Sequence, residues 1–284
     1  MLNPNEAAVL FSGGTDSTLT AALMADRFQK VHLVTYTRYG FFSVGNTKLN
    51  ARKLMDKYGK DRYVHHIINI DALTEHVFYE RYWHNLSRYG FFVLSICGLC
   101  KLAMHMAAVV FCLEHKIANV CDGANQGMYL FPDQMSVILQ EYKNMYARFQ
   151  INYFNPVFDF DSPPDTGFLD RLHFESVQSG MDDTAPGEGA ARKTTGCQLF
   201  KLGLMPSENV KGSPLDRKMQ PRCFQFILFN IFVQWYYLYN HTYDEYVAAT
   251  QRFYKDKIAC LSGLLDDYAR LGAESKLFKL TKAR

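Results

Sequence analysis

The stretch that most constrains the fold is a glycine-rich turn near the start of the chain, where an apolar run stops abruptly. Residues 7–11 are apolar and predict a buried strand, and residues 15–27 carry apolar side chains at helical spacing. Between them lie Ser12, Gly13 and Gly14. Glycines let the backbone approach a ligand closely, and free N–H groups at a helix start bind anions. The turn therefore predicts a phosphate site, and the lack of a following lysine distinguishes it from an ordinary P-loop.

The turn has the sequence Ser-Gly-Gly-Thr-Asp-Ser, which resembles the SGGxDS signature of the PP-loop ATP pyrophosphatases, an adenine nucleotide α-hydrolase-like superfamily. The resemblance implies cleavage of ATP between its α and β phosphates, with Asp16 near a magnesium ion. It also implies a doubly wound sheet that binds ATP at the carboxyl ends of its strands. The residues that it assigns to ATP are Ser12, Gly13, Gly14, Thr15, Asp16 and Ser17.

The first half of the chain alternates predicted strands and helices. Further strands are predicted over 31–36, 63–70 and 118–121, and a helix opens at Gly45-Asn46 and stops at Gly59. This order predicts an α/β fold with a doubly wound, Rossmann-like parallel sheet. We expect residues 1–160 to form an ATP-binding α/β domain and residues 161–284 to form a mostly helical C-terminal region.

A polar loop, Asp122–Gln126, directly follows the last of these strands. Ligands of open α/β sheets bind at the carboxyl ends of the strands, so Gly123 and Asn125 are predicted to contact the nucleotide. A plain turn is the alternative, because Asp, Gly and Asn are common turn formers.

The cysteines form a second group of candidates. Cys97 and Cys100 form a CxxC motif before a helix that we expect over Leu102–His115. The helix dipole and Lys101 are expected to lower the thiol pKa there. Redox pairs, zinc sites and iron–sulfur clusters all use this spacing. Seven cysteines, an odd number, fit a reducing compartment better than a disulfide scaffold.

Two distant cysteines, Cys197 and Cys223, lie at the ends of predicted elements, whereas Cys112, Cys121 and Cys260 fall inside apolar patterns and are expected in the core. We expect Cys97, Cys100 and at least one of the two distant cysteines to converge at the carboxyl edge of the sheet, facing the nucleotide. Convergence of three thiolates would imply a bound zinc or cluster.

A PP-loop followed by CxxC and a distant cysteine resembles the tRNA-thiolating branch of the superfamily. In that branch an adenylated oxygen is displaced by sulfur. The resemblance implies either a persulfide pair, Cys100 and Cys197, or an iron–sulfur cluster held by Cys97, Cys100 and one of Cys197 or Cys223. A tRNA or small-molecule substrate and a sulfur donor protein are the implied partners.

Two other classes stay open. One is a PP-loop ligase that uses ammonia to form an amide or a nitrile, as in queuosine-precursor synthesis, with the cysteines holding a structural zinc. Its close-packed C-terminal cysteine cluster is absent here. The other is a non-enzymatic nucleotide-binding protein of the same fold, which the intact Ser12 and Asp16 disfavour.

The C-terminal half predicts helices over 224–239 and 243–271. The first is strongly aromatic, which is typical of a core or a homodimer interface. The stretch Ser179–Lys193 predicts a mobile loop that is either a lid or a linker. The net charge of +3 neither demands nor excludes nucleic acid. Because the first strand begins at once and no uncharged apolar run approaches 20 residues, we expect a cytoplasmic protein without membrane segments.

Overall fold

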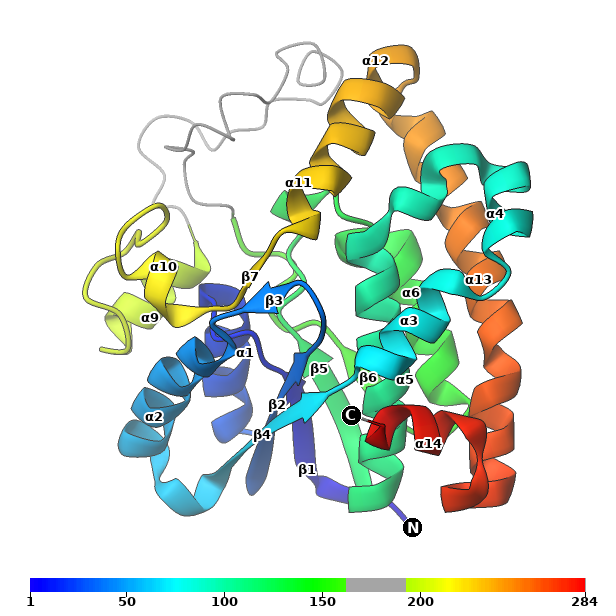
Figure 1. The fold of residues 1–284 in the computed structure, drawn as a ribbon. Helices are drawn as coiled ribbons and strands as arrows, with labels where there is room; N and C mark the ends of the chain where they lie inside the picture. Colours follow the sequence, from blue (N-terminus) through cyan, green and yellow to red (C-terminus); the bar gives the residue numbers. More distant parts are fainter. Residues whose placement is uncertain (162–192, 284) are drawn as a thin grey trace.

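The structure is a computed structural model that describes residues 1–161 and 193–283. It consists of a parallel sheet with helices on both faces (Figure 1). The predicted loop Ser179–Lys193 lies outside the described residues except for Lys193.

The main sheet has five strands in the order β4-β2-β1-β5-β6, and each neighbouring pair is parallel. Its strands are β1 (Asn3–Leu10), β2 (Lys30–Thr37), β4 (Tyr63–Asn69), β5 (Ile117–Asp122) and β6 (Asn152–Phe154). The chain leaves β1 toward β2 on one side and later returns on its other side as β5, so the strand order reverses next to β1. Ligands of open sheets bind at such a reversal. The predicted α/β fold class is confirmed.

Two apolar cores sandwich the sheet, one on each face. The helices of the first face are α1 (Thr15–Ala25), α2 (Thr47–Tyr58), α9 (Thr195–Lys201) and α10 (Asp216–Met219). Those of the second are α3 (Asp71–Tyr79), α4 (Tyr82–Tyr89), α5 (Ile96–His115), α6 (Ser136–Ala147), α11 (Gln225–Asn230), α12 (Leu238–Asn240), α13 (Tyr243–Leu271) and α14 (Lys276–Lys282). The segment after residue 193 thus contributes to both cores.

The helix α5 is mostly buried and packs against α3, α11 and α13. Within the described residues it is the one helix long and apolar enough to cross a membrane, but 72% of its most apolar window is buried inside the protein. It is therefore placed as a core helix. It begins at Ile96 instead of Leu102, so the CxxC motif forms its first turn.

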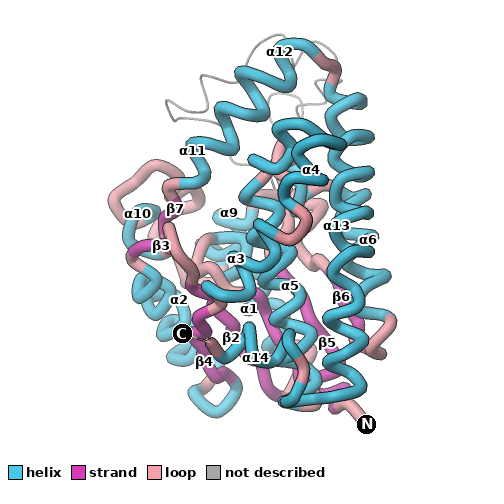
Figure 2. The backbone as a smooth tube through the Cα atoms, turned by 45° about the vertical axis from the view of Figure 1, so that its right-hand side comes forward, coloured by secondary structure: helices cyan, strands magenta, loops and turns pink. Residues whose placement is uncertain are grey.

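A second, two-stranded sheet joins distant parts of the chain and was not predicted. In it β3 (Phe41–Phe42) pairs in antiparallel fashion with β7 (Arg222–Cys223), and Phe41 lies opposite Cys223. Figure 2 shows β3 and β7 side by side next to α10. The pairing brings Cys223 to the carboxyl edge of the main sheet, beside the end of β2.

The C-terminal helices depart from the expected pattern at one place. The aromatic stretch 224–239 is helical, but Ile231–Tyr237 is a π-helix between α11 and α12. The longest helix, α13, begins at a capping box in which Thr242 and Glu245 satisfy each other's backbone N–H groups. This cap fixes where the final long helix begins.

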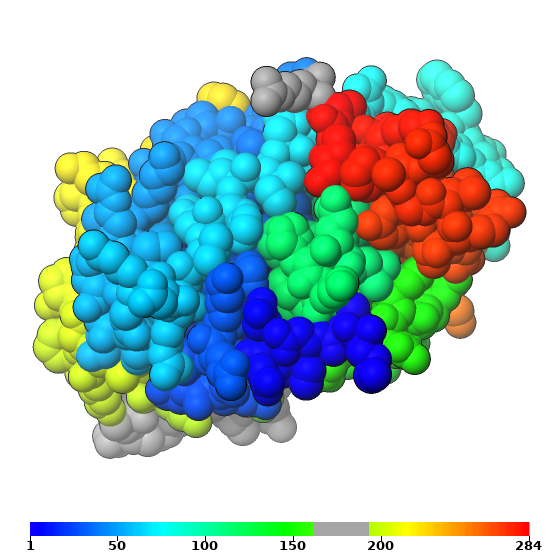
Figure 3. Space-filling view, turned by 90° about the horizontal axis from the view of Figure 1, so that it is seen from below, coloured from blue at the N-terminus to red at the C-terminus, as the bar shows by residue number. Residues whose placement is uncertain are grey.

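The end of the molecule opposite the glycine turn holds both ends of the described chain, which Figure 3 shows from below. There the N–H of Asn3 donates to the carbonyl of Lys116, and Lys282 of α14 forms an ion pair with Glu114. These contacts tie both termini to the end of α5.

Candidate functional site

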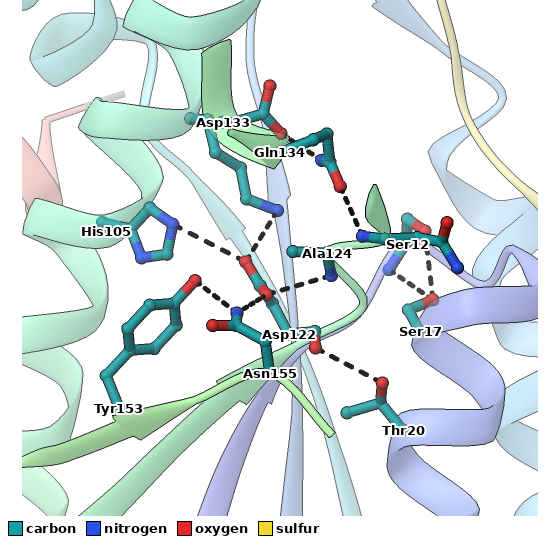
Figure 4. A network of polar contacts seen from close by, with 12 residues as sticks. Ser12, Ser17, Thr20, His105, Asp122, Ala124, Asp133, Gln134, Tyr153 and Asn155 are labelled. Carbon is teal, nitrogen blue, oxygen red and sulfur yellow. Dashed lines mark hydrogen bonds and ion pairs between the residues drawn. The ribbon is translucent and has the colours of Figure 1, made fainter. Parts of the chain in front are cut away.

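The glycine turn connects β1 to α1 and is held by its two serines. Gly13 has a φ of +78°, which only glycine adopts without strain, and Gly14 is the extended residue that caps α1. The Ser12 and Ser17 hydroxyls lie 3.0 Å apart, and the N–H of Gly14 points to the Ser12 hydroxyl at 3.3 Å (Figure 4). Ser12 is exposed. The turn therefore presents the Ser12 hydroxyl to solvent beside the N-terminus of α1.

Two segments close tightly around this turn. A Cβ added to Gly123, in the loop after β5, would lie 2.6 Å from the Ser17 nitrogen. Added to Gly14, it would lie 2.7 Å from the Gln220 side-chain oxygen, and added to Gly13, 2.4 Å from the Met219 carbonyl. The segment that leads into Cys223 therefore lies against the two glycines of the turn.

Asp16 is half-buried at the start of α1 and bonds to α9. The Thr195 hydroxyl donates to its Oδ1 at 2.5 Å. Burial raises the pKa of Asp16, and the Thr195 hydrogen bond opposes that rise. Cys197 lies two residues beyond Thr195 and is buried, so the structure places it beside α1.

The loop after β5 uses its polar groups internally. The Asn125 amide donates to the carbonyls of Val157 and Phe160, and its oxygen accepts the N–H of Gly127. Asn125 is buried. Its place in the structure is that of a side chain that shapes the loop, whereas Gly123 is the residue that touches the start of α1.

A buried ion pair joins the cysteine motif to this loop. Lys101 Nζ lies 3.2 Å from Asp122 Oδ2, and His105 Nε2 lies 3.7 Å from the same oxygen. Asn155 donates to Asp122 Oδ1 at 2.7 Å (Figure 4). Burial is the largest influence on Asp122 and would raise its pKa, but Lys101, His105 and the hydrogen bonds from the Ala124 N–H and the Asn155 amide together lower it. Because Lys101 follows Cys100 and Asp122 precedes Gly123, the pair fixes the two halves of the site to each other.

The network also settles the protonation of His105. Burial lowers the pKa of His105 to about 3 against the attraction of Asp122, so the imidazole is neutral near pH 7. Tyr146 holds its Nδ1 at 3.0 Å. His105 thus acts as a buried packing residue behind the site.

The cysteines are brought together by a residue that the sequence analysis missed, Arg38. Its Nε donates to Cys100 Sγ at 2.6 Å and its Nη2 donates to Cys223 Sγ at 3.4 Å. Cys97 lies close enough for the charges of Cys100, Cys223 and Arg38 to affect its pKa. Within the described residues, no hydrogen bond joins Cys197 to Arg38 or to the other three cysteines. The distant cysteine that joins the CxxC motif is therefore Cys223.

The expectation of low thiol pKa values at the CxxC motif is wrong for the resting protein. Burial raises the pKa of Cys97 well above its ordinary value and that of Cys100 to about 11, although Arg38 pulls both down. Lys101, which was expected to help, is paired with Asp122 instead. Desolvation of a thiolate here outweighs the helix dipole.

Comparison with solved structures found distant likenesses, two of which are described here. A predicted subunit of a tRNA methyltransferase from Methanocaldococcus jannaschii has a TM-score of 0.36 and 20% identity, over 55% of this chain and 69% of that chain. The U34-tRNA thiolase NcsA from Methanococcus maripaludis, with its 4Fe–4S cluster, has a TM-score of 0.35 and 13% identity, over 66% and 68%. No protein-family model and no curated protein matches. At this distance, the case for a function rests on the residues of this chain.

Proposed function

We propose that this protein cleaves ATP to AMP and pyrophosphate, adenylates an oxygen of its substrate, and replaces that oxygen with sulfur from a thiol pair. The observation that carries the proposal is the placement of Met219 and Gln220 against Gly13 and Gly14, only a few residues before Cys223. Three residues of extended chain span at most about 11 Å. The sulfur of Cys223 and the glycine turn are therefore parts of one site.

The turn supplies what the phosphates of ATP need. Helix-terminal N–H groups and the exposed Ser12 hydroxyl are donors for phosphate oxygens, and the positive end of the α1 dipole favours their charge. Asp16 suits magnesium, which binds proteins through one or two carboxylates plus substrate phosphates. Magnesium held there would neutralise the phosphate charge. The Thr195 bond to Asp16 Oδ1 would fix the direction of the carboxylate.

The chemistry follows from leaving-group ability. A substrate carbonyl oxygen attacks the α-phosphorus and pyrophosphate leaves, which turns the oxygen into part of an AMP leaving group. A persulfide on Cys223 then attacks the activated carbon, and AMP departs. The Cys100 sulfur attacks Cys223 Sγ, which forms a Cys100–Cys223 disulfide, releases the thiocarbonyl product and sends the Cys100 proton to solvent. A dithiol reductant restores both thiols, and a persulfide donor protein reloads Cys223.

The half-exposed Cys223 and the buried Cys100 suit these two roles. Sulfur from a donor reaches an accessible thiol more readily, whereas the thiol that resolves the intermediate needs contact only with its partner. The order of PP-loop, CxxC and distant cysteine favours a nucleobase carbonyl in tRNA as the substrate oxygen. A sulfur-bearing nucleoside would then be the product.

A shared metal or cluster fits these thiols poorly. Within residues 1–161 and 193–283, no group of three or more His, Cys, Asp or Glu side chains is arranged to hold a metal ion. The Arg38 guanidinium occupies the edge that Cys100 and Cys223 share. A metal ion would need to stand about 2.3 Å from each sulfur, where a cation is already placed. The proposed reaction therefore uses the two thiols without a cluster.

The test is product analysis with purified protein, ATP, magnesium, tRNA and a persulfide donor. Wild-type protein is expected to release AMP and pyrophosphate, and nucleosides from the digested tRNA should gain sulfur. Asp16→Ala and Ser12→Ala should abolish AMP release while the protein stays folded, because neither side chain belongs to the apolar cores. Asp26→Ala, on an exposed residue at the far end of α1, is the matched control.

Two results would contradict the proposal. ADP as the main product would exclude cleavage at the α-phosphorus. Incorporation of ammonia nitrogen without sulfur would instead favour the ammonia-dependent ligase.

A further inference from the structure

Arg38 lies directly after β2 and is buried, with an exposed fraction of 4%. Its guanidinium uses all three nitrogens. Nε donates to Cys100 Sγ and Nη2 to Cys223 Sγ, while Nη1 donates to the Tyr39 carbonyl at 2.6 Å. Nε and Nη2 form one edge of a rigid planar fork, which binds two acceptors side by side. The two sulfurs therefore lie next to each other along that edge.

The surroundings of this cation lack the usual counter-ion. Within the described chain, no ion pair joins Arg38 to a carboxylate, although the charge of Asp133 acts on the same Cys97 and Cys100 thiols. The rings of Phe41 at 4.5 Å and Phe78 at 5.7 Å face the guanidinium. A buried charge is costly unless an opposite charge is close to it. Among the groups to which the guanidinium donates, those that can carry a negative charge are the sulfurs of Cys100 and Cys223.

We propose that Arg38 is a positioning residue that holds the sulfur carried by the Cys100–Cys223 pair in its anionic form. The inference rests on the proposed function and adds the group that retains the reactive sulfur. A persulfide is more acidic than a thiol. Loading Cys223 with sulfur therefore places a negative charge beside the Arg38 guanidinium.

The fold explains why this geometry is specific to Arg38. Phe41 pairs with Cys223 between β3 and β7, so the short strand that follows Arg38 also fixes the register of Cys223. Cys100 is held independently in the first turn of α5. The two donors of the guanidinium edge thus set the separation of two sulfurs that come from different elements. A lysine keeps the charge but has no fork, so it can bind one sulfur well and not both.

The experiment loads the full-length protein with inorganic polysulfide, removes the excess, and measures sulfane sulfur by cyanolysis and by intact mass. Wild-type protein is expected to gain one cyanide-labile sulfur atom, and peptide mapping should place it on Cys223. Arg38→Gln should retain it about tenfold less or worse, since charge-assisted hydrogen bonds are lost. Arg38→Lys should be intermediate. Arg270→Gln, an exposed arginine on α13, is the control and should match the wild type.

Several outcomes would overturn the inference. Equal sulfur retention by Arg38→Gln and wild type would show that the guanidinium does not hold the sulfur. The anaerobically purified protein could instead contain stoichiometric iron or zinc that is lost on Cys97→Ser. That result would mean that the thiols bind metal and that Arg38 does not hold the sulfur.

The same measurements separate this inference from the proposed function. Release of AMP by a wild-type protein that retains no sulfane sulfur would sink the role of Arg38 and leave the ATP chemistry intact. Retained sulfur that depends on Arg38, without release of AMP, would contradict the ATP half of the proposed function alone. Arg38→Lys guards against a folding artefact, because it keeps the buried cation and the aromatic contacts.

Discussion

Replacement of Gly123 by alanine tests the closest contact between the two halves of the site. The added Cβ would lie 2.6 Å from the Ser17 nitrogen and 2.7 Å from the Asp16 carbonyl carbon. Both are backbone atoms of α1 that cannot rotate away. To reach an ordinary contact of 3.4 Å, the loop and the helix must separate by about 0.8 Å. The movement would shift the N–H groups that we assign to phosphate.

The expected cost is that of an overpacked interior, about 1–3 kcal/mol of the free energy of unfolding. In a chain of this size each kcal/mol lowers the melting temperature by about 2–4 °C. The activity should fall further than stability alone explains, because misplacement of about 1 Å in an active site costs on the order of 100-fold. Thermal unfolding and AMP release at a temperature where both proteins are folded measure the two effects separately.

Gly263→Ala is the matched control for this substitution. Gly263 is an exposed residue inside α13, and an added Cβ would meet nothing within 4 Å. Alanine should stabilise the helix by up to about 1 kcal/mol and leave AMP release unchanged. A Gly123→Ala protein with wild-type melting temperature and wild-type AMP release would refute the argument that the β5 loop abuts α1 at the nucleotide.

Two further substitutions test the packing and the pH response. Gly98→Ala would place a Cβ 2.2 Å from the Tyr254 hydroxyl oxygen, so the unfolding midpoint in urea should fall by the equivalent of about 1–3 kcal/mol, and an unchanged midpoint would contradict the packing at the CxxC motif. Burial lowers the pKa of His65 and of His66 to about 4, below an unfolded value near 6.5. The unfolded chain therefore binds more protons than the folded chain in this range. The free energy of unfolding should decline as the pH falls from about 6.5 to about 4. His66→Gln should make that decline shallower in melting curves recorded across this range, and parallel curves for variant and wild type would show that His66 does not contribute.

The glycine turn was predicted from sequence alone because its information is local. A strand, two glycines and a helix start within eleven residues, so the spacing already states where Gly13 must turn and where α1 must begin. The alternating elements extended this to a parallel α/β sheet, which the structure confirms. The order of the strands places the loops after β1 and β5 next to each other. The prediction that Gly123 lies near the glycine turn depended on this neighbourhood.

The small two-stranded sheet could not be predicted because its evidence is not local. Phe41–Phe42 and Arg222–Cys223 are two residues long and are separated by most of the chain. Strands this short have no measurable periodicity, and their pairing becomes favourable only once the main sheet has brought β2 and the Met219–Cys223 segment together.

The sequence by itself determined the glycine turn, the α/β fold and the set of candidate cysteines, because each depends on residues close together in the chain. Only the tertiary structure decided that Cys223, and not Cys197, shares a site with Cys100, and that Arg38 joins them. It also reversed the expected effect on the thiol pKa of Cys100. The physical reason is the same in each case: burial and charge pairing depend on which surfaces meet, and residues 38, 100 and 223 meet only in the folded chain.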